Sequence, residues 1–84
     1  MKEGRVMSLA EVDNGEVVLI KTLNGGRRFI ERLNSMGIYE GMKVRTIRHA
    51  PFNGPVMIQG VDSPLKVMIG RGMAQKIEVE LVNN

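Results

Sequence analysis

Few side chains in this sequence could carry out covalent or metal chemistry. Its 84 residues include no cysteine and a single histidine, His49. A transition-metal site needs several converging Cys, His or carboxylate ligands, and the acidic residues here show no close ligand spacing. A serine nucleophile would need that same histidine as its base, while Ser8 and Ser63 stand in capping and turn positions. The sequence therefore predicts no enzyme activity, no resident metal site and no cofactor.

The composition is that of a small domain that folds in water. Hydrophobic residues make up 43% of the chain and charged residues 25%, which is ordinary for a globular domain. The longest apolar run, Val17 to Ile20, is four residues long, whereas a membrane-spanning helix needs about 20. Residues 1–10 contain charged residues and no apolar core of a secretory signal. We therefore expect a cytoplasmic protein that does not insert into the membrane.

The charge of the chain is mildly basic and uneven along its length. Twelve Lys and Arg residues against nine Asp and Glu residues give a formal net charge of +3. The segment from Lys21 to Arg48 holds seven of the basic residues and only two acidic ones. This segment could form a basic face. A solvated surface of mixed charge is the alternative, because no run of five or more like charges occurs.

The clearest element in the sequence is an amphipathic helix that ends near Gly37. Its apolar positions, which fall within an arc of roughly 120° at helical spacing, are Phe29, Ile30, Leu33 and Met36. The rest of the helical wheel is polar and includes three arginines. Gly37 follows the last apolar position, where a left-handed residue typically ends a helix.

Five further segments have the composition and alternation of short strands. They are residues 16–23, 42–49, 56–61, 65–69 and 77–81. Ser8 and Glu11 have the spacing of a capping box, which predicts a helical turn over residues 9–12. A second helical turn is predicted within residues 70–75, where glycines interrupt the strand pattern.

These elements predict a mainly β fold: a small antiparallel barrel of about five strands. One helix lies between the first two strands, and short helical turns lie near both ends. No linker or repeat divides residues 1–84, so we expect a single domain. The predicted core consists of Val18, Ile20, Phe29, Leu33, Met36, Val44, Val56, Ile58, Val67, Ile69, Ile77 and Val79.

Five short motifs follow one another between residues 7 and 82. They are Ser8-Leu9-Ala10-Glu11-Val12, Gly15-Glu16-x-Val18-x-Ile20, Gly25-Gly26, Arg32-Leu33-x-x-Met36-Gly37-Ile38-x-x-Gly41 and Ala50-Pro51-x-x-Gly54-Pro55. In order and spacing they resemble the FeoA family of ferrous iron transport proteins. The block from Leu33 to Gly41 is the most specific part. Thr46 departs from the family pattern, which usually has an aliphatic residue there.

The resemblance implies an SH3-like barrel in the cytoplasm that acts as an accessory protein of ferrous iron uptake. The implied partner is the FeoB-like ferrous iron permease of the inner membrane, which carries a cytosolic GTP-binding domain. Through this partner the chain could lie at the membrane periphery. A protein without catalytic residues or metal ligands would act on such a permease by binding one of its states more tightly than another.

The helix and the turn after it are the candidate partner-binding surface. Arg27, Arg28 and Arg32 would supply charge, while Ile38 and Tyr39 would supply an apolar and an amphipathic anchor. Two other functions stay open: a small basic RNA-binding barrel, and an adaptor for an unrelated protein. Nucleic acid is not the expected partner, because the chain has only three aromatic residues and Phe29 belongs to the apolar stripe, which leaves at most two to stack on bases.

Overall fold

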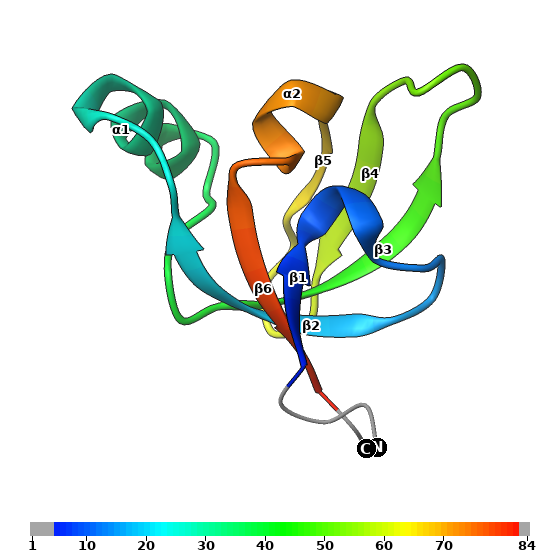
Figure 1. Cartoon of the computed structure of the whole chain (residues 1–84). Helices are drawn as coiled ribbons and strands as arrows, with labels where there is room; N and C mark the ends of the chain where they lie inside the picture. The colour runs from blue at the N-terminus through cyan, green and yellow to red at the C-terminus, as the bar shows by residue number, and fades with distance from the viewer. Residues whose placement is uncertain (1–4, 83–84) are drawn as a thin grey trace.

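The computed structural model describes residues 5–82 and is built around one antiparallel sheet of six strands (Figure 1). The strands are β1 (Val6–Ser8), β2 (Val17–Leu23), β3 (Lys43–His49), β4 (Val56–Gly60), β5 (Lys66–Ile69) and β6 (Ile77–Leu81). Their order in the sheet is β1-β6-β2-β3-β4-β5. The sheet is therefore open, with β1 and β5 at its edges.

All five strands predicted from alternation are confirmed, with bounds that differ by one residue or less at each end. The sixth strand, β1, is missing from the prediction. It has three residues, which are too few to show a period of two, and it exists because Met7 pairs with Val79 of β6. Tertiary pairing rather than local sequence makes this strand.

Three short helical elements accompany the sheet, and their positions agree with the prediction. They are the 3₁₀ turn η1 (Leu9–Glu11), the helix α1 (Arg27–Ser35) between β2 and β3, and the single turn α2 (Arg71–Ala74) before β6. The backbone N–H of Ser8 donates to Glu11 Oε1 at 3.4 Å at the start of η1. No helix among residues 5–82 is long and apolar enough to cross a membrane.

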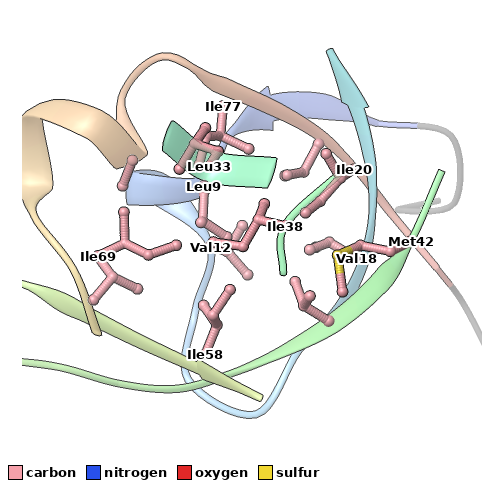
Figure 2. Packing of buried hydrophobic residues seen from close by; sticks show 14 of the residues in the cluster. Leu9, Val12, Val18, Ile20, Leu33, Ile38, Met42, Ile58, Ile69 and Ile77 are labelled. Atoms are coloured by element: carbon pink, nitrogen blue, oxygen red, sulfur yellow. The ribbon is translucent and has the colours of Figure 1, made fainter. Parts of the chain in front are cut away.

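The core lies inside the curved sheet and is closed by side chains from η1 and the segment after α1 (Figure 2). Nine of the twelve predicted core residues are fully buried, whereas Phe29, Met36 and Val67 are only half-buried and pack at its margin. Val67 belongs to the edge strand β5, which explains its exposure. Phe29 and Met36 lie toward one side of the apolar stripe of α1, and only Leu33 in that stripe is fully buried.

Thr46 is a polar residue in this otherwise apolar interior. Its side chain is 0% exposed, and its hydroxyl Oγ1 has no hydrogen-bond partner. Its backbone is well paired: the N–H donates to the carbonyl of Glu16, and its own carbonyl accepts from Gly15. The unpaired hydroxyl therefore lowers stability without serving the sheet.

Candidate partner-binding surface

The start of α1 depends on two glycines that connect it to β2. A Cβ atom at Gly25 would collide with the ring of Phe29, so only glycine lets the chain enter the helix this closely. Gly26 is the N-cap residue and has no side chain to satisfy the first N–H groups of the helix. Lys76 Nζ lies over the Phe29 ring, 5.6 Å from the ring centroid.

The three predicted arginines of α1 are all exposed. Arg27 Nε lies 3.5 Å from Glu31 Oε2, and both side chains are largely in water, at 90% and 67% exposure. Arg28 and Arg32 form no ion pair within residues 5–82. Because they are four residues apart, they lie on one face of the helix and present two unneutralised guanidinium groups together.

The prediction that Ile38 forms part of an exposed surface is wrong, because its side chain is 0% exposed. α1 ends in a Schellman motif: the N–H of Gly37 donates to Asn34 at 3.0 Å, and the N–H of Ile38 donates to Leu33 at 2.9 Å. Gly37 has the left-handed φ of +91° that this motif requires. The motif places Ile38 against Leu33, and Figure 2 shows Ile38 among the core side chains.

Tyr39, the next residue, is 53% exposed and remains available to a partner. Its backbone N–H lies 3.3 Å from the sulfur of Met42, which is itself buried. The side chain also lines a small surface hollow with Lys43 and Asp62. The turn after α1 thus contributes one exposed aromatic residue to the candidate surface.

An apolar margin borders the arginine face of α1, and the sequence prediction assigned it to the core. Phe29 and Met36 are each half-buried. On a helical wheel Met36 lies about 40° from Arg32, so an apolar edge and a cationic edge run side by side. The candidate surface is therefore Arg27, Arg28 and Arg32, the margin formed by Phe29 and Met36, and Tyr39.

A second constellation, centred on Arg71, is absent from the sequence prediction. From α2, Arg71 donates through Nε to the carbonyl of Gly54 (3.2 Å) and through Nη1 to the carbonyl of Ala10 (3.3 Å). Its Nη2 lies 3.2 Å from His49 Nδ1, and His49 Nε2 lies 2.6 Å from the carbonyl of Val12. These contacts assign the proton of a neutral His49 to Nε2. The network ties η1, β3 and the β3–β4 loop together.

The Arg71 network is structural in character. Its acceptors are backbone carbonyls and one imidazole nitrogen. Among residues 5–82, no group of three His, Asp or Glu side chains is arranged to hold a metal ion. The only sequence sign of the network is an arginine between two glycines, Gly70 and Gly72, in an otherwise apolar stretch.

Comparison with known proteins gives a consistent family. The model of the FeoA domain matches residues 7–81. A curated Methanocaldococcus jannaschii relative, named Fe(2+) transport protein A, is 44% identical over 72 residues, which are 86% of this chain and 83% of the relative. The crystal structure of an iron uptake regulatory protein (FeoA) superposes with a TM-score of 0.80 at 24% identity, covering 93% of this chain and 99% of that chain.

A third relative joins this domain to a transporter. It is a Porphyromonas gingivalis protein named as a fusion of Fe(2+) transport protein A with the Fe(2+) transporter FeoB. It is 32% identical over 78 residues, which cover 93% of this chain but only 9% of the fusion protein. The family match over residues 7–81 and the curated relative at 44% identity agree with the SH3-like fold of the solved neighbours. The chain belongs to the FeoA family, whose named relatives take part in Fe(2+) transport.

Proposed function

We propose that this chain is an accessory protein of ferrous iron uptake that binds the GTPase-containing ferrous iron permease through the candidate surface on α1. The observation that carries the proposal is the fusion protein, in which the related segment and the Fe(2+) transporter FeoB occupy one polypeptide. Two proteins that are fused in one organism are often partners elsewhere. A separate chain must then supply by affinity what the fusion supplies by covalent linkage.

The surface of α1 suits such a contact because its cations are not used by the fold. Arg28 and Arg32 are exposed and have no ion-pair partner among residues 5–82. They offer planar guanidinium groups to carboxylates of the permease. The half-buried margin of Phe29 and Met36 and the exposed ring of Tyr39 add the apolar and aromatic contacts that carry most of the affinity at protein interfaces.

Binding alone can make this contact regulatory. A ligand shifts a conformational equilibrium only to the extent that it binds one state more tightly than the other. We propose that the chain distinguishes nucleotide-bound from nucleotide-free states of the permease GTP-binding domain. The direction of the preference decides whether the chain activates or restrains uptake.

The test is a binding titration of the full chain against the purified full-length permease in detergent. The titration is run without nucleotide and with a GTP analogue, and is repeated with the Arg28→Glu/Arg32→Glu double variant. We expect saturable binding that depends on nucleotide. Each reversal of charge should weaken the affinity for the permease, because it turns an attraction to a carboxylate into a repulsion. The two reversals together should weaken the affinity by about tenfold or more.

A matched control separates position from net charge. The Arg48→Glu/Lys66→Glu variant has the same change in net charge, but its substitutions lie on β3 and β5. It should bind the permease as the unchanged chain does, once long-range attraction is screened by salt. Equal losses of affinity in both variants would contradict the placement on α1. Absence of binding to the full-length permease would contradict the proposed function itself.

A further inference from the structure

The outer face of strands β3, β4 and β5 is basic, and its cations form no ion pair with any residue of the range 5–82. From Gly41 to Val61 the chain contains no Asp or Glu, and the β5 segment adds Lys66 without an acid of its own. Arg45, Arg48 and Lys66 are all exposed. The two ion pairs among residues 5–82 lie elsewhere, on β2 with β6 and on α1.

Strand register arranges these cations in two parallel rows. In the first row, Arg45 of β3 pairs with Gln59 of β4, which pairs with Lys66 of β5. The second row is nearer the β3–β4 loop and begins with Arg48, which pairs with Met57. Met57 in turn pairs with Met68 on the edge strand, and Met68 is 51% exposed.

A bulge in β3 brings the second row onto this face. Thr46 pairs with Ile58 and Arg48 pairs with Met57, so Ile47 is an extra residue in β3. Without it, strict alternation would turn Arg48 toward the core face.

Beyond the second row, the β3–β4 loop holds an aromatic residue in water. Phe52 is 99% exposed in this loop, which connects β3 to β4 (Figure 1). Phe52 and Asn53 have φ values of +59° and +57°, and the N–H of Gly54 donates to the carbonyl of Pro51 at 3.1 Å. This pattern is that of a type I′ turn, whose first central position favours Asn, Asp or Gly.

Phe52 therefore works against the fold through its backbone conformation, and its exposed ring contributes no packing to offset this cost. The loop is nevertheless held firmly. Arg71 Nε donates to the carbonyl of Gly54, and the N–H of Ala50 donates to the carbonyl of Pro55 at 2.9 Å. A firmly held loop that presents an aromatic ring to solvent indicates a role in contact with another surface.

We propose that this hairpin, with Phe52 at its tip and Arg48, Arg45 and Lys66 behind it, binds the surface of an anionic phospholipid bilayer. The order of side chains along the hairpin matches the order of layers in a membrane interface. The aromatic tip enters the boundary of the acyl chains. The row of Arg48, Met57 and Met68 lies behind it at the edge of the phosphate layer, and the row of Arg45 and Lys66 lies at the depth of the phosphates. In this peripheral contact no segment of the hairpin crosses the bilayer, and the permease is not required.

Two other anionic partners fit the face less well. A nucleic-acid strand would need aromatic rings beside the cations for its bases to stack on, whereas one row carries Gln59 and the other carries Met57 and Met68. A folded acidic protein would match the cations, but the centre of such an interface usually fills a pocket. Phe52 instead lies almost wholly in solvent in the loop, where a bilayer surface can receive its ring.

The experiment is co-sedimentation of the full chain with vesicles of equal parts phosphatidylglycerol and phosphatidylcholine, compared with vesicles of phosphatidylcholine alone. We expect binding to the anionic vesicles only, lost as salt is raised. The Arg48→Glu/Lys66→Glu variant should bind about tenfold more weakly or worse. The Arg28→Glu/Arg32→Glu variant, with the same net charge, should keep most of the binding.

Phe52 provides a direct readout, because the chain contains no tryptophan. In a Phe52→Trp variant, the single indole should shift its emission to shorter wavelength when anionic vesicles are added. Phe52→Asn, which suits the left-handed backbone, should weaken binding by about fivefold to tenfold. Unshifted emission, equal binding to neutral vesicles, or equal losses in both charge variants would overturn the proposal. Tight binding of a single-stranded RNA without vesicle binding would overturn it as well.

Discussion

The helix α1 and the β3–β4 loop (residues 50–55) are attached to the same sheet by opposite kinds of contact. α1 is held by apolar burial: Leu33 is 0% exposed, and the helix ends in a Schellman motif that adds the equally buried Ile38. The loop has no fully buried residue. It is held by hydrogen bonds, among them the one that Arg71 Nε donates to the carbonyl of Gly54.

Arginine therefore has two separate roles in this small protein. On α1, the arginines stand in water and can be changed without loss of a core contact. In α2, Arg71 is half-buried and joins three segments that are far apart in the sequence. Charge on the helix is available for a partner, whereas charge in the Arg71 network is committed to the fold.

The largest effect is expected where α1 depends on one side chain. Leu33→Ala should lower the free energy of unfolding by about 3 kcal/mol, because it opens a cavity at the fully buried side chain of the helix stripe. Chemical denaturation in urea measures this change. Arg32→Ala, at the neighbouring position, should change stability by less than about 0.5 kcal/mol. A small loss for Leu33→Ala would mean that apolar burial does not hold the helix.

The matching test of the loop is Arg71→Met, which keeps the length of the side chain and removes its donors. We expect a loss of about 2 kcal/mol, because the carbonyls of Gly54 and Ala10 and the Nδ1 of His49 lose a charged donor. Arg28→Met is the control and should be within about 0.5 kcal/mol of the unchanged chain. Equal losses of stability in Arg71→Met and Arg28→Met would contradict the distinction between a structural arginine in α2 and solvent-exposed arginines on α1.

The two regions also differ in how far the sequence predicts them. The period of apolar residues predicts α1 and five strands, because local periodicity reflects which face is buried. Ile38 was predictable in principle: once Gly37 is taken as the left-handed residue, the next position is the one that packs back on the helix. Arg71 was not, because its contact with Ala10 joins residues 61 positions apart and leaves no local pattern.

For the candidate surface as well, the sequence predicts what depends on local periodicity and does not predict what depends on tertiary packing. The exposure of Arg28 and Arg32 follows from their place outside the apolar stripe on the helical wheel. The half-exposure of Met36 does not, because the wheel assigns it to the apolar face and cannot show how much of that face the sheet covers.

The strand between the two regions contains a smaller defect that can be corrected. Thr46 on β3 buries a hydroxyl without a partner. Thr46→Val keeps the shape of the side chain and removes the unpaired group, so we expect stability to rise by about 1 kcal/mol. Thr22→Val, on the half-buried face of β2, is the control and should change stability by less than about 0.5 kcal/mol. A loss of stability in Thr46→Val would mean that the hydroxyl is satisfied in solution.

The smallest expected effect concerns the tip of the loop, where hydrogen bonding holds a residue that does not suit its conformation. Phe52→Gly should raise the free energy of unfolding by about 0.5 kcal/mol. It removes a left-handed penalty of about 1 to 2 kcal/mol for a residue with a Cβ atom, and part of this gain is lost to the greater freedom of glycine in the unfolded chain. The ring itself contributes little packing, because it is 99% exposed.

Asn53→Gly is the matched control for Phe52→Gly, because Asn53 has nearly the same backbone angle, with φ of +57° against +59°. Asparagine tolerates the left-handed region, so its replacement relieves less strain and should leave stability unchanged or slightly lower. A gain confined to Phe52→Gly would show that the loop retains its phenylalanine at a cost to the fold. A loss in Phe52→Gly would mean that the ring packs in solution, and the reason to assign it an external surface would disappear.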